Sequence, residues 1–364
     1  MLLYAFLIGV RPIYPLIHVP TFRADYDDFW RWYSNLDTAS PTSKLIEDPT
    51  FLSLMFTVLY CGAATAPLSL WTAGVLQSVK RDSVMEQLKS ASFASLKFVQ
   101  HLRFPTFNTL VALLFRHSCL KQEGEPHEDS GFVGTVVRIA QNMGLHLDGS
   151  RLGIDVVACE VRRRVWWHIL WLDVQNSVLN GSPLSCHHDN QYTAQMVSEI
   201  QDKDIHETAS PVGFLTSPTQ RSSASMLVAM GRFETSSFER LMVNKLQSAS
   251  SADCLNYLEK ALRNVQILLD CLRARLPAKG IPEKGLIPSR IANASPLTQK
   301  RLYGDSMEEP TVFTSWARVM LTMLQTEATI MFQKGLLGCE SNFDDQRRTR
   351  WNRYVYPPAQ RPEE

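Results

Sequence analysis

A single uninterrupted segment, Glu160–Asp173, limits the choice of fold more than any other part of the chain. It reads EVRRRVWWHILWLD. Its first half is charged, whereas Trp166 to Leu172 is apolar on almost every face of a helix and leaves no side for solvent. Glu160 precedes Arg163 and Arg164 by three and four positions, the favourable order for ion pairs along a helix. The segment therefore predicts a helix whose C-terminal half is surrounded by protein.

Asp173 lies on the buried stripe of this predicted helix. Helical rotation places Arg162, Trp166, Ile169 and Asp173 along one side. An ionised carboxylate is costly to bury unless a cation or a hydrogen-bond donor meets it, so Asp173 needs a partner. Arg162 is about three turns away, so we expect the partner on a neighbouring helix, with Arg138 as the first candidate. Such a pair either holds two helices in register or forms part of an anion or ligand site.

Helical periodicity extends along most of the chain, and the alternation typical of strands is scarce. Asp48 followed by Pro49 marks a helix start. Gly144 predicts a left-handed C-terminal cap, with Leu145 as the apolar contact that accompanies it. We expect five helices in this region, three of them beginning at Thr106, Ser130 and Asp155: residues 51–66, 70–101, 106–120, 130–143 and 155–180. The patterns predict an all-α fold, a multi-helix bundle.

The second half of the chain has a different composition. Residues 206–225 are rich in Ser, Thr and Pro, as in a surface linker. Leucines from Asp253 to Leu276 recur near a 3.5-residue period and serve either core packing or a dimer seam. A last amphipathic helix is expected from Pro310 to about Leu337. We predict one domain with an N-terminal part (1–205), a linker (206–225), a helical C-terminal part (226–340) and a frayed tail (341–364).

The charge balance limits the partners of the chain. Lys plus Arg number 37 and Asp plus Glu number 36, which leaves a net charge of +1. A protein that clamps nucleic acid over its whole surface carries more positive charge. We therefore expect no DNA binding by these residues alone. The basic run Arg347–Arg350 is interpreted as a solvated face, with phosphate contact as the alternative.

Two apolar stretches need comparison with membrane and targeting segments. Pro49–Val79 contains no charged residue over a length that could cross a bilayer. Gly62, Pro67 and Gly74 interrupt it, so we interpret it as two buried core helices. Met1–Val10 lacks the basic region and cleavage site of a signal peptide. We expect it to be the end of a buried helix, in a sequence that begins in the middle of a structure.

The residues that usually carry chemistry form no pattern of a catalytic or metal site. The seven cysteines include no C-x-x-C pair, and G-x-S-x-G, H-E-x-x-H, P-loop and G-x-G-x-x-G motifs are absent. His187 and His188, followed by Asp189, diverge in either a helix or a strand and make a poor chelate. Three other histidines are expected to be core residues with one satisfied nitrogen each: His18, His146 and His168. We expect no catalytic, cofactor or metal site and no enzyme.

Three motifs follow one another between residues 10 and 200. They are PIYPLIHVPTF at Pro12–Phe22, AQNMGLH at Ala140–His146, and EVRRRVWW from Glu160, continued by an aspartate and a Gly-Ser-Pro. Together they resemble the regulatory (middle homology) domain of fungal zinc-cluster transcription factors. The positions that carry the resemblance are Pro15, His18, Phe22, Gly144, Leu145, His146, Glu160, Arg162, Arg163, Trp166, Trp167, Asp173, Gly181 and Pro183.

The resemblance implies a nuclear, all-α regulatory domain that controls RNA polymerase II-dependent expression, for example of a metabolic or secondary-metabolite gene set. In that family DNA is contacted by an N-terminal binuclear zinc cluster held by six cysteines. The first cysteine here is Cys61, inside a predicted buried helix. We therefore expect zinc and DNA contact only through a missing N-terminal cluster. The chain is then either truncated or a regulator that lacks a DNA-binding part.

The implied partners are proteins of the transcription machinery, a second subunit in a homo- or heterodimer, and a small-molecule effector in an apolar cleft between helices. No membrane partner is implied. One alternative is an adaptor or dominant-negative partner that dimerises with a full-length zinc-cluster factor through residues 253–276. A second alternative is a helical ligand-binding protein or an enzyme of unknown reaction.

Overall fold

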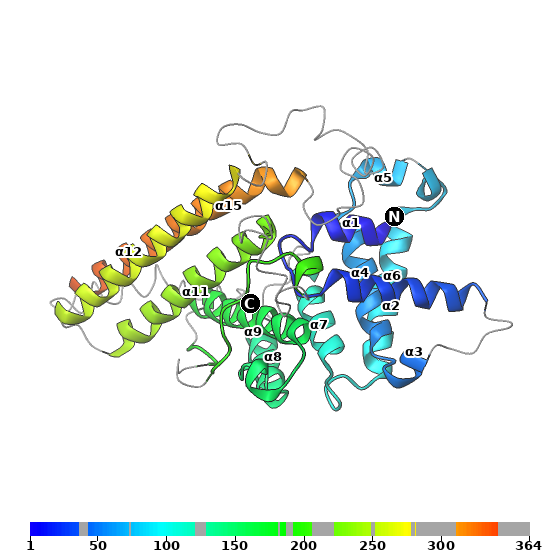
Figure 1. The fold of residues 1–364 in the computed structure, drawn as a ribbon, viewed down its shortest axis with the longest axis horizontal. Coiled ribbons are helices and arrows are strands. Elements are labelled where there is room, and N and C mark those ends of the chain that lie inside the picture. Colours follow the sequence, from blue (N-terminus) through cyan, green and yellow to red (C-terminus); the bar gives the residue numbers. More distant parts are fainter. Residues whose placement is uncertain are drawn as a thin grey trace, which may run out of the picture.

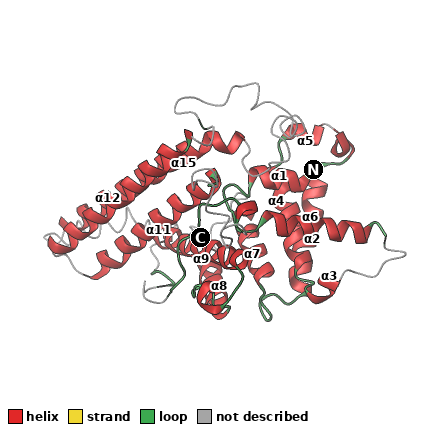
Figure 2. Cartoon of the chain, in the orientation of Figure 1, coloured by secondary structure: helices red, strands yellow, loops and turns green. Residues whose placement is uncertain are grey.

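The computed structural model describes residues 1–35, 43–72, 74–120, 129–180, 183–186, 192–205, 222–248, 252–277, 281 and 311–340. Regular structure in these ranges is helical apart from one isolated antiparallel bridge between Ile200 and Ser222 (Figure 1 and Figure 2). The prediction of an all-α fold is confirmed. The α-helices are α1 (Leu2–Gly9), α2 (Val19–Tyr33), α3 (Ser43–Glu47), α4 (Phe51–Thr65), α5 (Leu68–Thr72), α6 (Arg81–Phe98), α7 (Phe107–Leu120), α8 (Asp129–Asn142), α9 (Val156–Asn180), α11 (Ala224–Ser248), α12 (Ala252–Arg275) and α15 (Thr311–Glu340).

The N-terminal group of helices is built around α4, against which α1, α6 and α7 pack (Figure 1). Most side chains of α4 are buried. Gly62 allows α1 to approach closely, because a Cβ at this position would lie 2.2 Å from the carbonyl oxygen of Leu2. The apolar character of this region therefore reflects packing on all sides. Among the described residues, no helix combines the length and hydropathy that a bilayer crossing requires.

The C-terminal group consists of α11, α12 and α15, which lie side by side at the opposite end of the molecule (Figure 1). Gly231 of α11 marks where the three helices converge, since a Cβ there would lie 2.7 Å from Leu321 Cδ2 and 3.0 Å from Leu269 Cδ2. Helix α9 packs against α11, and its residues from Val165 to Leu172 share a core with residues of α1, α4 and α7. It therefore joins the two groups of helices.

The leucine stripe of residues 253–276 is buried within this C-terminal group. Leu258, Leu262, Leu269 and Leu272 all belong to the core that α12 shares with α11 and α15. The interpretation as core packing is therefore confirmed. The alternative of a dimer seam through these leucines is wrong, because the helices of the same chain already cover the stripe.

One predicted helix start has the expected capping contact. Asp155 Oδ2 accepts the N–H groups of Val157 and Ala158 at 3.0 and 3.3 Å, at the start of α9, and so satisfies N–H groups that lack a partner within the helix. The start predicted at Asp48 and Pro49 is displaced, because α4 begins at Phe51, after Thr50, without a side-chain capping bond. Asp48 Oδ1 instead accepts the N–H of Thr50 at 3.0 Å in the turn before the helix.

The predicted end of α8 is also confirmed. Gly144 has a φ of 68°, in the left-handed region, and its N–H donates to the carbonyl of Gln141 at 2.9 Å. The N–H of Leu145 donates to the carbonyl of Ala140 at 2.9 Å, and the Leu145 side chain is buried. These two bonds and the apolar contact form a Schellman motif.

Two of the predicted helices are wrong in detail. The expected helix 70–101 is three pieces: α5, a 3-10 turn at Gly74–Ser78, and α6 from Arg81. Leu70 and Trp71 pack on alanines of α1 and α4, so the chain changes direction before α6 packs along α4. This tertiary packing overrides the apolar repeat. α8 begins at Asp129, so Ser130 lies inside its first turn and is not the residue before it.

The remaining segment predictions fall partly on residues outside the described ranges. The linker 206–225 is described only from Ser222, and α11 already begins at Ala224. The tail 341–364, the basic run Arg347–Arg350 and the group His187–Asp189 all lie outside the described residues. The predicted helix at the N-terminus is present as α1, with Leu3, Phe6 and Leu7 buried.

Candidate functional site

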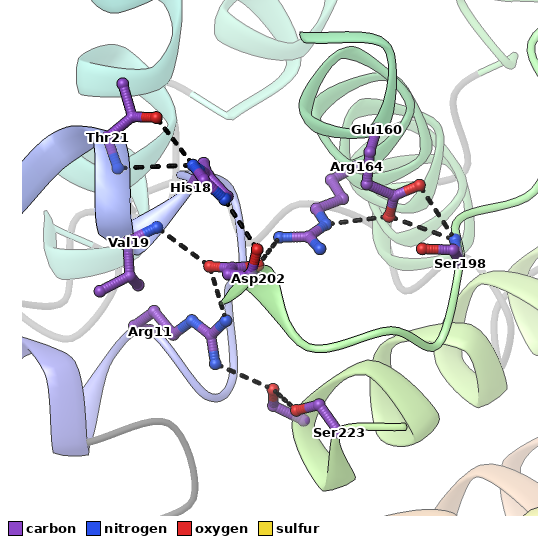
Figure 3. A network of polar contacts seen from close by, with 10 residues as sticks. Arg11, His18, Val19, Thr21, Glu160, Arg164, Ser198, Asp202 and Ser223 are labelled. Atoms are coloured by element: carbon purple, nitrogen blue, oxygen red, sulfur yellow. Dashed lines mark hydrogen bonds and ion pairs between the residues drawn. The ribbon is translucent and has the colours of Figure 1, made fainter. Parts of the chain in front are cut away.

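Asp202 is the buried centre of a polar network between the two groups of helices. It lies in a 3-10 turn, η5 (Asp202–Asp204), and its side chain is not exposed. Its Oδ2 accepts hydrogen bonds from Arg11 Nη2 at 2.9 Å and from the N–H of Val19 at 3.0 Å. Its Oδ1 accepts from Arg164 Nη1 at 2.7 Å. Figure 3 shows these side chains converging from the α1–α2 loop and from α9.

His18 connects the first sequence motif to the same centre. Its Nε2 lies 2.9 Å from the carbonyl oxygen of Asp202, which can only accept, so Nε2 carries the proton. Its Nδ1 therefore accepts, from the hydroxyl of Thr21 at 2.7 Å and the N–H of Thr21 at 3.4 Å, and caps α2 (Figure 3). Both ring nitrogens are satisfied, rather than the single one that the sequence predicted.

Arg164 connects the third motif to the network. Its Nε donates to Glu160 Oε1 at 3.0 Å, and both carboxylate oxygens of Glu160 accept the N–H of Ser198, at 3.2 and 3.1 Å. The predicted pair of Glu160 with Arg164 is thus confirmed. Two guanidinium groups, of Arg11 and Arg164, face two carboxylates, of Glu160 and Asp202, so the buried charges balance.

The electrostatics of the network follow from this balance. Burial alone would raise the pKa of Asp202, but the charges of Arg164 and Arg11 hold it well below its usual range. Burial would lower the pKa of Arg164, whereas Asp202 and Glu160 raise it above its usual value. Asp202 and Arg164 therefore stay ionised in the folded protein at neutral pH. Removing one partner would leave an uncompensated charge in the interior.

Arg163 does not pair with Glu160, which corrects the second predicted ion pair. It forms a bidentate pair with Asp148, through Nε to Oδ2 at 2.8 Å and Nη2 to Oδ1 at 2.7 Å. Asp148 Oδ2 also accepts the N–H of Gln195 at 2.8 Å. The hydrogen bonds from Arg163 lower the pKa of Asp148 well below its usual range. Arg163 thus attaches the segment 192–205 to the turn after α8.

Arg162, the first of the three arginines, contacts the second motif. Its Nη2 donates to the carbonyl oxygens of Met143 and Gly144, at 3.2 and 2.9 Å, just beyond the end of α8. A cation is favourable at this end of a helix because its carbonyls lack partners. The backbone carbonyl of His146 accepts the N–H of Thr193 at 2.8 Å. The His146 side chain itself is half-buried, and its Nδ1 has no hydrogen-bond partner.

Asp173 forms a second buried ion pair, and its partner is Arg240 rather than Arg138. Asp173 Oδ2 lies 3.4 Å from Arg240 Nη1 of α11, whereas Arg138 lies on an exposed position of α8. The N–H groups of Ser185 and Cys186 donate to the two Asp173 oxygens at 2.8 and 3.0 Å. The predicted structural pair is therefore real, but it joins α9 to α11. The reason is the tertiary arrangement, in which α11 covers the Asp173 side of α9.

The aromatic part of α9 is enclosed, as its sequence predicts. Trp166 is completely buried, and the Trp167 Nε1 donates to the carbonyl of Gln195 at 2.8 Å. His168 is also completely buried, and neither ring nitrogen has a hydrogen-bond partner. Burial and the nearby charge of Arg232 lower the pKa of His168 well below its usual value, so the ring is neutral. The prediction of one satisfied nitrogen is wrong for this histidine.

The other predicted positions are structural. Pro15 and Phe22 are buried, and the Phe22 ring lies 5.6 Å from the ring of Phe51. Pro183 is exposed, and Gly181 lies outside the described residues. The structure therefore brings His18 together with Glu160 and Arg164, and Gly144 together with Arg162. It keeps Asp173 in a separate pair.

Sequence reasoning missed Arg11 and Asp202 of the network, and it missed Arg240, the partner of Asp173 in the separate pair. The signal for Arg11 was a charged residue directly after the apolar stretch 1–10. Asp202 lies in a short polar run, DKD, that resembles an exposed turn. The available clue was that several motif arginines require buried carboxylates, and Glu160 alone could not serve all of them.

A further buried cation, Arg232 of α11, has aromatic neighbours. Its guanidinium carbon lies 4.9 Å from the ring centroid of Trp171 and 5.4 Å from that of Tyr14. Its Nη2 donates to the carbonyl of Ile13 at 2.6 Å. Burial lowers the pKa of Arg232 to about 10, so it stays protonated at neutral pH. The contact attaches the α1–α2 loop to α9 and α11.

The network has a structural role, because it holds separate segments of the chain together. Both carboxylate oxygens of Asp202 and of Glu160 accept hydrogen bonds from donors of the protein itself. In the part of the chain that the structure describes, no three His, Cys, Asp or Glu side chains gather closely enough to hold a metal ion. Arg11 Nη1 also donates to the hydroxyl of Ser225 at 3.2 Å, at the start of α11. The network therefore fixes four segments against one another: the α1–α2 loop, α9, residues 192–205 and the start of α11.

Comparison with known proteins gives a consistent result. Residues 3–272 match the family described as "Fungal specific transcription factor domain". The chain is 42% identical over 354 residues to "Transcription factor macR" of Penicillium terrestre, covering 96% of this chain and 41% of that protein. It is 42% identical over 306 residues to "Transcription factor yanR" of Aspergillus niger, covering 82% of this chain and 37% of that protein.

A more distant relative is "Pyriculol/pyriculariol biosynthesis cluster transcription factor 1" of Pyricularia oryzae. The identity is 28% over 218 residues, covering 59% of this chain and 27% of that protein. The chain thus spans about two fifths of the length of macR and yanR. No solved structure matches it.

Proposed function

The chain belongs to the family of fungal specific transcription factor domains, and from this premise we propose that it is the regulatory part of a longer transcription factor. It would act in the nucleus and control RNA polymerase II-dependent genes. The longer protein would contact DNA through a zinc cluster that is separate from the residues described above. The chain itself would do no chemistry.

The target genes we propose are those of a secondary-metabolite pathway. This proposal is supported by the name of the Pyricularia oryzae relative, which assigns that protein to a biosynthesis cluster.

The observation that carries the regulatory role is the Asp202 network. It joins segments that are up to 214 residues apart in the sequence, from Arg11 to Ser225, and its central ion pairs are buried. A group of helices held together in this way moves as one unit, because loss of any single partner is costly. Such a unit can present a surface for the transcription machinery or withhold it. Two residues of the network, Arg164 and His18, lie in the motifs on which the resemblance to the family rests.

One alternative was an adaptor that dimerises with a full-length factor through residues 253–276, and the structure of these residues does not support it. The stripe 253–276 is buried against α11 and α15. A dimer through the stripe would require the C-terminal group of helices to open. We therefore do not retain it as a candidate function.

The test is a tethering experiment in a filamentous fungus. The whole chain is fused to a bacterial DNA-binding domain that recognises a site upstream of a reporter gene. We expect reporter transcription to rise or fall relative to the DNA-binding domain alone. An output equal to that of the DNA-binding domain alone, at equal protein abundance, would contradict the proposed function.

A matched pair of variants tests the role of the network in that assay. Asp202→Asn removes the central charge, whereas Asp204→Asn makes the same chemical change two residues away, at a half-buried position of the same turn. We expect only Asp202→Asn to change the reporter output. Equal outputs from the two variants would show that the network is not needed for the regulatory effect.

A further inference from the structure

A cavity of about 510 Å³ lies next to the Asp202 network, between α2, α4, α7 and the N-terminal end of α9. Its wall includes His18, which caps α2, Thr21 of α2 and Val161 of α9, so the cavity and the network share residues or immediate neighbours. Its volume is in the range of sites that hold small organic molecules, about 300–1,000 Å³. The size admits a molecule of one or two fused rings.

The walls of the cavity are mainly aromatic and aliphatic. Phe22, Phe51 and Phe107 contribute rings from three different helices, and Leu54 and Val161 complete the apolar surface. The rings of Phe22 and Phe51 are tilted relative to each other, with centroids 5.6 Å apart. A flat aromatic body suits such walls, because ring edges and faces pack at these distances.

Arg162 is the cation in the wall of this cavity. Its Nη2 donates to the carbonyls of Met143 and Gly144, while its Nε is buried and has no hydrogen-bond partner. No carboxylate of the described residues forms an ion pair with it, in contrast to Arg163 and Arg164 on the same helix. Burial lowers the pKa of Arg162. An anionic group in the cavity would supply the missing compensation.

Two carboxylates also line the cavity, and they indicate where such an anion would lie. Asp155 Oδ2 is held by the N–H groups of Val157 and Ala158, so the start of α9 partly compensates its charge. Asp155 is two helical turns, about 10 Å, from Arg162 along α9. Asp25 belongs to α2, which forms another wall. The arrangement favours one acidic group at Arg162 and an uncharged remainder.

We propose that this cavity binds a small aromatic carboxylic acid, with its ring between the phenylalanines and its carboxylate on Arg162. Occupancy would place the ligand against His18 and Val161, and hence against the elements that the Asp202 network joins. The binding claim does not depend on the proposed transcriptional role, because it is tested with the isolated chain.

The experiment is isothermal titration calorimetry of the whole purified chain with 2-naphthoate and, separately, with the neutral 2-naphthamide. The two probes have the same ring system and differ in charge. We expect 2-naphthoate to bind at least about tenfold more tightly than 2-naphthamide, as a charge-assisted contact predicts. Absence of 2-naphthoate binding at millimolar concentration, or equal binding of the two probes, would overturn the proposal.

Variants assign the binding to this cavity. Arg162→Met should weaken 2-naphthoate about tenfold or more and leave 2-naphthamide within about twofold. Arg151→Met is the control, because Arg151 is exposed and is not part of the cavity wall. Unchanged 2-naphthoate affinity in a folded Arg162→Met would refute the assigned contact.

A second variant does not depend on the arginine. Ala158 lines the cavity at an exposed position, so Ala158→Trp should fill the space without disturbing the buried core. We expect it to abolish binding of both probes while the melting temperature stays close to that of the unmodified chain. Binding that survives in the folded Ala158→Trp variant would place the probes elsewhere and overturn the proposal.

Discussion

Arg164 Nη1 of α9 lies 2.7 Å from Asp202 Oδ1 of η5, and neither side chain is exposed to solvent. They are 38 residues apart in the sequence. A buried pair of this kind is stable only if both ions have further partners, and each of them has: Arg164 contacts Glu160, and Asp202 contacts Arg11. This relationship explains why the arginine run of α9 and the loop before α2 are held together.

The first prediction concerns the central charge. Asp202→Asn should lower the free energy of unfolding by about 3–5 kcal/mol, because Arg11 and Arg164 lose their common counter-ion in the interior. Urea unfolding followed by circular dichroism measures the change. Asp204→Asn, the matched control, should change it by less than about 1 kcal/mol. Similar losses in both variants would contradict the central position of Asp202.

The same aspartate makes the stability depend on acid pH. Its pKa is lowered in the folded state, so its contribution is present above the unfolded pKa of about 3.9 and is lost as pH falls through the folded pKa. The unmodified chain should therefore lose stability steeply below about pH 4, and Asp202→Asn less steeply. Unfolding curves recorded between pH 3 and 6 would test this; parallel pH profiles would argue against it.

The second prediction concerns the pair of Asp173 and Arg240. Asp173→Ala should destabilise the chain by about 2–4 kcal/mol, since it leaves Arg240 buried without its carboxylate. The double variant Asp173→Ala, Arg240→Met should be less destabilised than the sum of the single changes, because it removes both charges. Additive losses would show that the two side chains do not interact.

The third prediction concerns the enclosed tryptophan. Trp166→Ala should cost about 2–4 kcal/mol or more, because its side chain is completely buried. Trp316 of α15 is 59% exposed and provides the matched control. Trp316→Ala should leave the melting temperature nearly unchanged. Near-identical melting of the two variants would refute the burial of the α9 aromatic segment.

The fourth prediction concerns Glu239 of α11. Burial raises its pKa well above the usual value, and its neighbour Glu327 of α15 raises it further. Gln175 of α9 donates to both carboxylates, at 3.3 and 3.4 Å, while Arg318 and Lys334 line the same groove. With a raised folded pKa, stability is highest below the unfolded pKa of about 4.3 and falls as pH rises through the folded pKa.

Glu239→Gln should remove the loss of folding stability that accompanies rising pH. We expect the variant to be more stable than the unmodified chain at pH 8, by about 1 kcal/mol or more, and to differ little at pH 4. Glu259→Gln is the control, because Glu259 is exposed and pairs with Arg263 on the same helix. A stability gain that is the same at pH 4 and pH 8 would contradict the proton-linked origin.

The fifth prediction concerns DNA. The net charge of +1 and the absence of a cysteine cluster lead us to expect no sequence-specific mobility shift by this chain alone. Any weak shift should disappear as salt is raised, as nonspecific phosphate contact does. A tight, sequence-specific complex at physiological salt would contradict this expectation.

The sequence by itself determined the local features, because these depend on residues close together in the chain. The cap at Asp155, the left-handed Gly144 and the enclosed Trp166 were predictable from helical geometry and apolar patterning. The pair of Glu160 and Arg164 was predictable for the same reason, since they are one turn apart. The resemblance to the family also rests on short motifs, each made of residues that are close together in the chain.

Only the tertiary structure decided which distant groups meet. Arg163 pairs with Asp148, and Asp173 pairs with Arg240 rather than Arg138, because long-range packing sets these distances. Asp202 gave no local signal, since a short acidic turn looks the same whether it is exposed or buried. The break of the expected helix 70–101 has the same origin: Leu70 and Trp71 gain more from burial against α1 and α4 than from a continuous helix.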